Sequence, residues 1–425
     1  MEPSDLHVSG RLQVPGDKSI SHRALMFGAL GSGRSRVRGV LQSADVGATA
    51  ACLRAMGWDI PPLDADFTIT GGGLQPLRQQ AVASLPCGNS GTTARLMAGI
   101  AAAQRLTSEF DGDASLRRRP MRRVSEPLHD MGARFAWLHD QGCLPMRVTG
   151  GTLRELHRVM DVPSAQVKSA LLLAGCCAGV PVSIVEPMAT RDHTERMLRA
   201  AGVRVDTVDQ AIALYPPAHL NALDTIVPGD PSSAAFFAGL AAGAAHGQLT
   251  LTSVLLNPHR TGFLSVLRRM GARIQVLNER LSGGEPVGDL LVLAGPLTGT
   301  AIAPGEVPSL IDEIPLLAAL GAVAEGELRV TGASELRVKE SDRIATTVAN
   351  LRAAGVNADE LPDGLVVQGG AAVRSASVVT HGDHRIAMAF AVLGALTNRD
   401  LRIDDPDCVS VSFPTFWTDL ARVTR

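Results

Sequence analysis

Seven polar segments in this 425-residue chain combine basic, hydroxyl and acidic side chains, and each one opens a stretch of small apolar residues. Lysine is rare: Lys18, Lys168 and Lys339 are the only lysines among 40 basic residues, and each lies in one of these segments. Arginine binds carboxylates and phosphates in a bidentate manner, whereas lysine supplies a compact charge on a flexible stem. The segments therefore predict binding sites for small anions.

Spacing within the segments supports this prediction. Ser19 and Arg23 are four residues apart, as are Lys339 and Arg343, so on a helix each pair shares one face. The segment 88–93, GNSGTT, combines three hydroxyl groups with glycines that allow a ligand to approach the backbone closely. A helix that begins in such a segment adds free N–H groups and partial positive charge, which favour bound phosphate or carboxylate.

The sequence lacks the motifs of several other functional classes. Its six cysteines and eleven histidines show no metal-ligand spacing. Asp-His pairs occur at 192–193 and 383–384, but the adjacent Arg191 and Arg385 disfavour a bound cation. The segment GDKS at 16–19 lacks the glycine spacing of a nucleotide phosphate loop. We therefore expect no metal and no cofactor.

Composition narrows the class of partner. A net charge of −2 and an aromatic content of 3% give neither a basic field for nucleic acid or anionic membranes nor many platforms for stacking bases. The apolar runs at 170–182 and 234–245 are too short to span a bilayer, and the first residues, MEPSD, do not resemble a signal peptide. We expect a cytoplasmic monomer with small-molecule substrates, no nucleic acid and no membrane.

The elements that position the polar segments follow a repeat. A Leu-x-x-x-Gly pattern recurs at intervals of about 70 residues and ends at Gly57, Gly132, Gly202, Gly271 and Gly355. Each glycine is expected to close a helix in the left-handed conformation. The sequence VPGD at 14–17 returns at 227–230, half a chain length later. The chain is therefore predicted to have two equivalent halves, each of three α/β units.

Helices are predicted at 17–30, 89–103, 163–174, 230–245, 312–324, 340–354 and 383–396. Four aspartates are expected to be their N-caps: Asp17, Asp230, Asp312 and Asp383. Pro163 and Pro315 suit first helical turns. Because the helices are mainly apolar, we expect them in the core of each half, with their N-termini at a shared surface.

Four segments resemble signatures of the 5-enolpyruvylshikimate-3-phosphate synthase family, one of the enolpyruvyl transferases. They are VPGDKSISHR at 14–23, GNSGT at 88–92, RVKESDR at 337–343 and GDHR at 382–385. The resemblance runs through nearly the whole chain and implies an α/β (α+β) fold of two similar lobes. Each lobe would have three βαβαββ units with pseudo-threefold symmetry, helices buried and sheets outside. Residues 19–226 would form the first lobe and residues 1–18 plus 227–425 the second, joined by two crossover segments.

The resemblance also implies a transferase activity and its residues. The enolpyruvyl group of phosphoenolpyruvate would pass to the 5-hydroxyl of shikimate 3-phosphate through a tetrahedral ketal, with release of phosphate, in aromatic amino acid biosynthesis. Asp312 would be the base, Glu340 the proton shuttle, and Lys18 would contact both substrates. Shikimate 3-phosphate would be bound by Lys18, Ser19, Arg23, Ser164, Ala165, Gln166, Arg191, Asp312 and Lys339. Phosphoenolpyruvate would be bound by Lys18, Gly91, Arg119, Gln166, Arg343 and Arg385, with Thr92 beside Gly91.

The chain departs from the family at two positions. Val411 stands where many members have a lysine, and Ala165 where many have a second serine. Gly91 is the residue found in members that glyphosate inhibits, so we expect sensitivity to glyphosate.

Two alternative functions remain open. The sister enzyme that uses UDP-N-acetylglucosamine typically has Lys-Asn in place of Lys18-Ser19 and a cysteine in the loop corresponding to 111–121, which has none here. A non-catalytic anion-binding protein on the same scaffold would keep the arginines but could discard the acid and the base. Asp312 and Glu340 are both present, which favours the enzyme.

Overall fold

The computed structural model describes residues 5–74, 82–370 and 372–424, so most of the MEPSD segment lies outside the described residues. The chain divides into two compact units. The N-terminal unit comprises Gly16–Val227 and Ser282–Glu285, and the C-terminal unit comprises Met1–Pro15, Pro228–Leu281 and Pro286–Arg425. These bounds differ from the predicted lobes at residues 16–18, at Val227 and at the turn 282–285, which belong here to the N-terminal unit.

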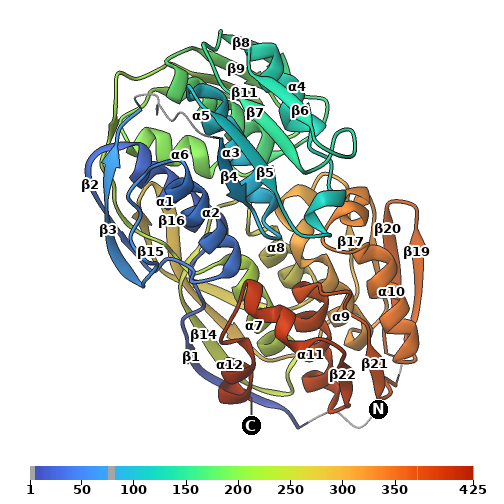
Figure 1. Ribbon diagram of the computed structural model, residues 1–425. Coiled ribbons are helices and arrows are strands. Elements are labelled where there is room, and N and C mark those ends of the chain that lie inside the picture. The colour runs from blue at the N-terminus through green and yellow to red at the C-terminus, as the bar shows by residue number, and fades with distance from the viewer. Residues whose placement is uncertain (1–4, 75–81, 371, 425) are drawn as a thin grey trace. The chain divides into compact units, whose positions relative to one another are not determined.

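The N-terminal unit contains three four-stranded sheets among its described residues (Figure 1). The first has the strands β12 (Leu220–Asn221), β2 (Gly31–Arg38), β13 (Asp224–Ile226) and β3 (Asp66–Gly72). The second has the order β4 (Ala83–Pro86), β5 (Thr107–Asp111), β7 (Met146–Thr149) and β6 (Arg134–Trp137). The third has the order β10 (Val205–Val208), β11 (Ala211–Leu214), β9 (Val182–Val185) and β8 (Leu156–Val159).

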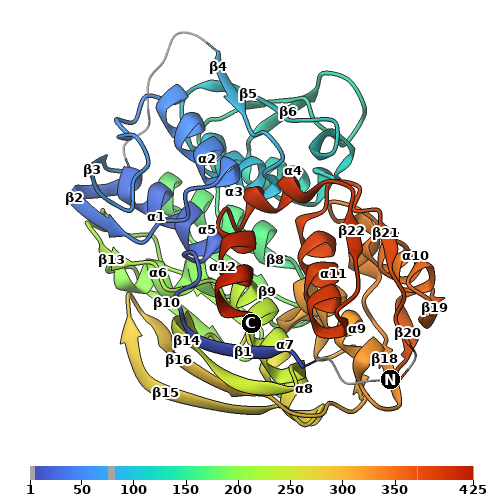
Figure 2. The ribbon, with the colours of Figure 1, turned by 90° about the horizontal axis from the view of Figure 1, so that it is seen from below.

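The C-terminal unit also has three sheets in its described part. In the first, β1 (His7–Leu12) pairs in parallel with β14 (His246–Leu255), followed by β16 (Glu285–Leu293) and β15 (Arg273–Ser282), and Figure 2 shows β1 beside β14. The second has the order β17 (Ala301–Ile302), β18 (Glu327–Val330), β20 (Gly364–Gln368) and β19 (Asn357–Leu361). The third pairs β21 (Ala376–Val378) with β22 (Leu401–Ile403).

One strand pattern recurs in both units. A parallel pair is extended by an antiparallel hairpin: β4 and β5 pair in parallel, and β7 and then β6 follow antiparallel. The same order occurs for β8, β9, β11 and β10, and for β17, β18, β20 and β19. A helix follows each of the first strands and returns the chain to the same sheet, which is the βαβαββ repeat that the family resemblance implies.

Six helices form the cores of the two units. They are α1 (Lys18–Leu30), α3 (Gly91–Ala103) and α5 (Ala165–Ala178) in one, and α7 (Pro231–Gly243), α9 (Ile314–Val323) and α11 (His384–Thr397) in the other. Nearly all of their residues are buried. Small residues allow this close packing, since a Cβ on Gly99 of α3 would lie 2.2 Å from the carbonyl oxygen of Ala170 in α5. The prediction of buried helices with sheets outside is confirmed.

Six further helices lie against these cores. They are α2 (Ala44–Ala55), α4 (Arg122–Met131), α6 (His193–Ala200), α8 (Gly262–Arg269), α10 (Arg343–Ala353) and α12 (Phe416–Val423). Five of them precede the glycines of the Leu-x-x-x-Gly pattern, all of which have positive φ, from 82° at Gly355 to 119° at Gly132. The predicted left-handed caps are confirmed, and any other residue there would be strained by about 1 kcal/mol or more. No helix in the described ranges is long and apolar enough to cross a membrane.

The N-cap predictions are confirmed at three of four positions. Asp17, Asp230 and Asp383 accept hydrogen bonds from backbone N–H groups of α1, α7 and α11. Asp312 instead lies in the 3-10 turn Ile311–Glu313 that precedes α9, so its carboxylate is available for other contacts. Pro163 also precedes its helix, because α5 begins at Ala165 behind the N-cap Ser164.

Four other short 3-10 helices connect these elements: Leu116–Arg118, Val307–Ser309, Ser334–Val338 and Pro406–Val411. Val411, the position of the missing lysine, ends the last of them and is partly buried.

Candidate active-site halves

The N-termini of α1, α3 and α5 are joined by side-chain hydrogen bonds in the N-terminal unit. Gln166 at the start of α5 donates from Nε2 to Thr92 Oγ1 of α3 at 3.0 Å. Arg23 of α1 donates from Nη2 to Ser169 Oγ of α5 at 2.7 Å. The predicted gathering of helix starts is therefore present within this unit. We call Lys18, Ser19, Arg23, Gly91, Thr92, Arg95, Arg119, Gln166 and Arg191 the N-terminal half-site.

Arg23 is held firmly inside this half-site. Only 3% of it is exposed, and it donates to Thr194 Oγ1 at 2.7 Å and to the Ser19 carbonyl at 2.9 Å, besides Ser169. Burial, and to a smaller extent the nearby charge of Arg191, lowers the pKa of its guanidinium to about 10, although Glu195 and Asp17 act in the opposite direction. Arg23 is still cationic at neutral pH and adds positive charge next to Arg191.

Three more cations line the half-site. Lys18 forms an ion pair with Asp45 of α2 and keeps 22% of its side chain exposed. Arg95 donates from Nη1 to Gln166 Oε1 at 2.7 Å, and Arg119 donates from Nη2 to Asn89 Oδ1 at 2.7 Å. Arg95 follows Gly91 by four residues, a spacing that places it with the anion-binding segment 88–93, although the family resemblance assigned it no substrate.

Gly91 lies between these two arginines. A Cβ at this position would stand 2.6 Å from Arg95 Nη1 and 3.5 Å from Arg119 Nη1. The absence of a side chain here therefore leaves both guanidinium groups close to the first turn of α3. A carboxylate or phosphate in this place would meet two arginines and the N–H groups of a helix start.

Lys168 does not belong to this half-site. Its side chain is 1% exposed and its Nζ lies 2.8 Å from Glu186 and 2.8 Å from Glu195. Burial by itself would lower the lysine pKa, but the two carboxylates raise it. The three lysines thus serve different purposes, and this one ties α5 to α6 and to the segment after β9. Of its neighbours, Ser164 caps α5 and Ala165 is the first residue of that helix.

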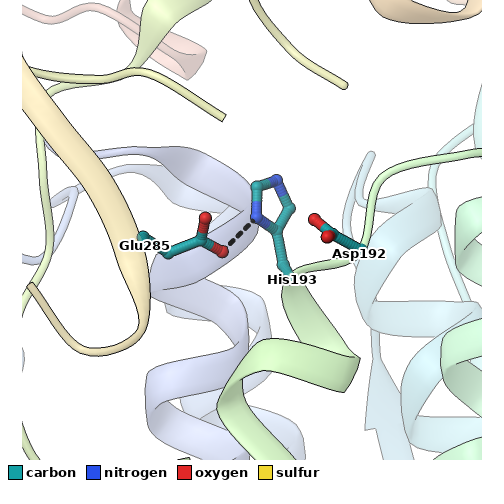
Figure 3. A group of neighbouring side chains, drawn as sticks. All are labelled: Asp192, His193 and Glu285. Atoms are coloured by element: carbon teal, nitrogen blue, oxygen red, sulfur yellow. Dashed lines mark hydrogen bonds and ion pairs between the residues drawn. The ribbon is translucent and has the colours of Figure 1, made fainter. Parts of the chain in front are cut away.

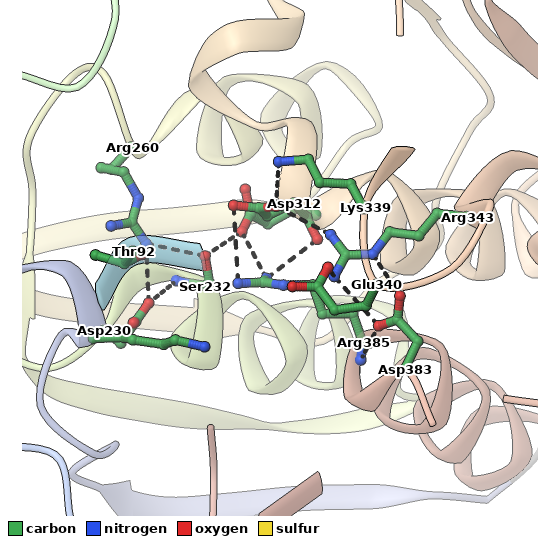
Figure 4. Close-up of polar contacts among 12 residues, drawn as sticks. Thr92, Asp230, Ser232, Arg260, Asp312, Lys339, Glu340, Arg343, Asp383 and Arg385 are labelled. Carbon is green, nitrogen blue, oxygen red and sulfur yellow. Dashed lines mark hydrogen bonds and ion pairs between the residues drawn. The ribbon is translucent and has the colours of Figure 1, made fainter. Parts of the chain in front are cut away.

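Carboxylates dominate the corresponding place in the C-terminal unit. Arg343, only 1% exposed, is surrounded by three of them, as Figure 4 shows. Its Nη1 lies 3.1 Å from Asp312 Oδ1, its Nη2 lies 2.6 Å from Glu340 Oε2, and its Nε lies 2.8 Å from Asp383 Oδ2. Burial would lower the arginine pKa, but these three charges raise it. We call Asp312, Glu313, Lys339, Glu340, Arg343, Asp383 and Arg385 the C-terminal half-site.

Asp312 lies at the centre of this group and is 7% exposed. Besides Arg343, its carboxylate has Lys339 Nζ at 3.6 Å and Arg385 Nη2 at 3.9 Å. Glu340 is more accessible, with 24% of its side chain exposed. The predicted base, Asp312, and the predicted proton shuttle, Glu340, therefore both contact the buried guanidinium of Arg343.

Asp383 fixes two predicted binding arginines at once. Its Oδ1 accepts the backbone N–H of Arg385 at 3.0 Å, and its Oδ2 accepts both Arg343 Nε at 2.8 Å and Ser341 Oγ at 3.0 Å. Burial alone would raise the pKa of this carboxyl group, but the charge of Arg343 lowers it. The sequence indicated only the N-cap role of Asp383.

A second group of ionisable side chains has metal-ligand types. Asp192, His193 and Glu285 place one possible ligand atom each within 4.8 Å of one another (Figure 3). His193 Nδ1 lies 2.8 Å from Glu285 Oε1, and Arg196 Nε lies 2.8 Å from Asp192 and 3.6 Å from Glu285. The guanidinium already supplies positive charge to both carboxylates, so this arrangement is accounted for as an ion-pair network.

The family model that matches this chain and two of its curated relatives all name the same family. Residues 4–420 match the family model described as EPSP synthase (3-phosphoshikimate 1-carboxyvinyltransferase). A 3-phosphoshikimate 1-carboxyvinyltransferase of Herpetosiphon aurantiacus is 46% identical over 97% of this chain and 96% of its own length. One from Synechococcus sp. strain WH7803 is 47% identical over 98% and 96%.

Solved structures show the same fold. An EPSP synthase from Acinetobacter baumannii has a TM-score of 0.88 and 41% identity, with 99% of this chain and 97% of that chain covered. The enolpyruvyl transferase NikO from Streptomyces tendae has a TM-score of 0.77 at 16% identity, covering 99% and 96%, which is a likeness of fold alone.

Proposed function

We propose, from the premise that the chain belongs to the EPSP synthase family, that its two half-sites act together on phosphoenolpyruvate and shikimate 3-phosphate. The protein is a transferase of the shikimate pathway, which leads to aromatic amino acids. It transfers the enolpyruvyl group of phosphoenolpyruvate to the 5-hydroxyl of shikimate 3-phosphate and releases phosphate. The roles of the individual residues are part of the proposal.

The N-terminal half-site offsets the charge of the substrates. Each substrate carries a carboxylate and a phosphate, and two unit charges 4 Å apart repel by about 4 kcal/mol at an effective dielectric near 20. Arg119 and Gly91 hold phosphoenolpyruvate, with Thr92 and Gln166 beside them. Lys18 contacts both substrates. Shikimate 3-phosphate is bound by Ser19, Arg23, Ser164, Ala165, Gln166 and Arg191, with Lys339 and Asp312 from the C-terminal half-site.

The C-terminal half-site carries out the proton transfers. Glu340 protonates the methylene carbon of phosphoenolpyruvate, which makes its C2 electrophilic, while Asp312 accepts the proton of the attacking 5-hydroxyl. The C2–O bond forms and gives a tetrahedral ketal phosphate. Loss of phosphate and of one methyl proton then restores the double bond. Arg343 and Arg385 bind phosphoenolpyruvate and hold its charge through these steps.

The observation that carries this proposal is the shared contact of Asp312 and Glu340 with the buried Arg343. The base acts on shikimate 3-phosphate and the acid on phosphoenolpyruvate within one turnover, and a common rigid partner holds the two carboxyl groups in a fixed relation. In an anion-binding protein without catalysis, two carboxylates at this place would only oppose the ligand.

The test measures phosphate release from phosphoenolpyruvate in the presence of shikimate 3-phosphate. Asp312→Asn and Glu340→Gln should each lower turnover by about a hundredfold or more, the range of a lost general acid or base. Glu306→Gln is a matched control, because Glu306 pairs with Arg269 on the surface of the same unit. Turnover of either site variant within threefold of the unmodified enzyme would overturn the assignment, as would phosphate release without shikimate 3-phosphate.

We further propose a cytoplasmic monomer that glyphosate inhibits. The guanidinium groups of Arg95 and Arg119, which lie close to Gly91, support inhibition by an anion that competes with phosphoenolpyruvate. Glyphosate should raise the apparent KM for phosphoenolpyruvate, and analytical ultracentrifugation should give one species of 44.5 kDa. A dimer would contradict the proposed monomer, and an unchanged KM for phosphoenolpyruvate would contradict the proposed inhibition by glyphosate.

A further inference from the structure

Glu313 is a buried acid directly beside the proposed base, and no role in the reaction has been assigned to it so far. It is 2% exposed and begins α9 as its N-cap residue. Its Oε1 accepts a hydrogen bond from Ser232 Oγ at 2.5 Å and lies 3.5 Å from Arg385 Nη1. A charge this deeply buried requires such partners, because burial raises the carboxyl pKa and the charge of Arg385 offsets that rise only in part.

Glu313 and its neighbour fix one end of the Arg385 guanidinium. Arg385 Nη1 donates to the carbonyl oxygen of Asp312 at 3.2 Å as well as lying against the Glu313 carboxylate. The other nitrogen, Nη2, stands 3.9 Å from Asp312 Oδ2, which is the long end of the ion-pair range. The guanidinium is thus anchored on the turn Ile311–Glu313 by Nη1, while Nη2 is held near the proposed base at a looser distance.

Glu313 is itself anchored from a second direction. Ser232, in the first turn of α7, receives a hydrogen bond from Arg260 Nη2 at 3.1 Å. The same Nη2 lies 3.1 Å from Asp230 Oδ1, the N-cap of α7 (Figure 4). Arg260 is 3% exposed, so this network is desolvated and its geometry is strongly constrained. The network connects the starts of α7, α9 and α11 through Glu313.

We propose that Glu313 is a positioning residue that holds Arg385 for phosphoenolpyruvate and keeps it from closing onto the Asp312 carboxylate. Glu313 does not contact a substrate in this assignment, and it acts through Arg385. Without its charge, Arg385 still has the Asp312 carboxylate within reach, at 3.9 Å. A closer pair there would withdraw the cation from the substrate and occupy the base. This inference rests on the proposed role of Arg385.

The decisive variant is Glu313→Gln in the full-length enzyme. It keeps the shape of the side chain and an oxygen that can accept from Ser232, but it removes the charge that faces Arg385. The KM for phosphoenolpyruvate should rise about tenfold, the loss typical of one hydrogen bond to a charged group, while the KM for shikimate 3-phosphate changes less than twofold. Glu306→Gln, the matched surface pair with Arg269, should change neither KM.

A double-mutant cycle separates positioning from general damage. Arg385→Gln alone should raise the KM for phosphoenolpyruvate by at least as much as Glu313→Gln. The double variant should be no worse than Arg385→Gln, because Glu313 acts through that arginine. Equal effects of Glu313→Gln on both KM values, or additive effects in the double variant, would overturn the inference.

The failure of the proposed site would look different. If Arg385→Gln leaves the KM for phosphoenolpyruvate unchanged, then the role of Arg385 itself is wrong. If Arg385→Gln raises it and Glu313→Gln does not, then only the positioning role is wrong. Ser232→Ala serves as a second variant should Glu313→Gln not fold, since it removes one anchor and leaves the charge. It should raise the same KM by about threefold, as expected for a neutral hydrogen bond, and no rise would contradict the proposal.

Discussion

The two half-sites differ in the sign of the charge that they present. The N-terminal half-site contains five cations and no carboxylate: Lys18, Arg23, Arg95, Arg119 and Arg191. Asp45, which pairs with Lys18, lies outside this set. In the C-terminal half-site, four carboxylates surround three cations: Asp312, Glu313, Glu340 and Asp383 around Lys339, Arg343 and Arg385.

In the proposed mechanism, this difference separates substrate binding from proton transfer. A surface with excess cations can take up substrates that carry phosphate and carboxylate groups. A group of carboxylates that is already neutralised by buried arginines can exchange protons without repelling those substrates. Binding should therefore depend most on the N-terminal half-site and proton transfer on the C-terminal one.

The largest expected effect follows from removing the central cation of the C-terminal half-site. Arg343→Met leaves Asp312, Glu340 and Asp383 without their shared partner, and Asp383 is completely buried. Breaking a buried ion pair from one side costs about 3–5 kcal/mol, and we expect a loss of this size in the free energy of unfolding, together with loss of turnover. Urea unfolding measures it, with Arg352→Met, from an exposed pair, as the control.

The pH dependence of this stability has a definite sign. The pKa of Asp383 is lowered in the folded protein by Arg343, after burial has acted in the opposite direction. Its contribution is therefore present above the ordinary aspartate pKa and is lost as the pH falls through the lower folded value. In Arg343→Met the acid fall in stability should be smaller, because burial then raises the pKa of Asp383 without the opposing charge of Arg343, and an unchanged acid limb would contradict the assigned contact.

A buried cation outside both half-sites sharpens the comparison. Lys168→Met should also cost about 3–5 kcal/mol of unfolding free energy, because Glu186 and Glu195 lose their partner. Since Lys168 is structural in this account, turnover at saturating substrate should stay within about twofold under conditions where the variant is folded. A loss of turnover like that of Arg343→Met would remove the distinction between the two buried cations.

The lysine contribution has the opposite pH dependence. The carboxylates raise the pKa of Lys168 in the folded state, although burial alone would lower it. Its stabilising effect is therefore present below the ordinary lysine pKa and is lost as the pH rises through the raised value. The alkaline fall in stability should be smaller in Lys168→Met. Unfolding curves recorded below and above the ordinary lysine pKa of about 10.4 can measure this difference.

A smaller effect is expected at Gly91. The methyl group of Gly91→Ala would stand 2.6 Å from Arg95 Nη1, so the flexible end of that arginine must move. We expect the KM for phosphoenolpyruvate to rise about tenfold, with the KM for shikimate 3-phosphate nearly unchanged. Gly47→Ala in α2 is the matched control, since a Cβ there would meet nothing within 4 Å. Equal effects of the two substitutions would contradict the account.

The smallest effect concerns the support of Arg23. Thr194→Ala removes the acceptor for Arg23 Nε and the donor to Ser169. Leaving a buried donor unsatisfied costs about 1–3 kcal/mol, and part of this should appear as a few-fold rise in the KM for shikimate 3-phosphate. Thr207→Ala, which removes an exposed hydrogen bond from Arg199, is the control. A rise in the KM for phosphoenolpyruvate alone would contradict the assignment of Arg23 to shikimate 3-phosphate.

Much of the fold was predictable because local rules determine it. The Leu-x-x-x-Gly pattern located five helix ends correctly, since a left-handed cap almost requires glycine. The polar segments located the helix starts to within a few residues. Asp312 was the exception, because a short 3-10 turn before α9 displaced it from the cap position, and such turns leave little trace in sequence.

The partners of the site residues were not predictable. Nothing in the spacing shows that Lys168 lies between Glu186 and Glu195, or that Arg343 gathers Asp312, Glu340 and Asp383. Glu340 is only three residues from Arg343, but Asp312 and Asp383 are 31 and 40 residues from it. Only the packing of the core helices brings such distant residues together. Sequence thus indicated which side chains could do chemistry, while the pairing of their charges required the structure.

Calorimetric titration of phosphoenolpyruvate into Glu340→Gln saturated with shikimate 3-phosphate tests the division between binding and proton transfer most directly. The account predicts a dissociation constant within about threefold of the unmodified enzyme, although turnover is lost. An affinity weakened by about thirtyfold or more, equivalent to about 2 kcal/mol, would show that this carboxylate serves binding and would contradict the account.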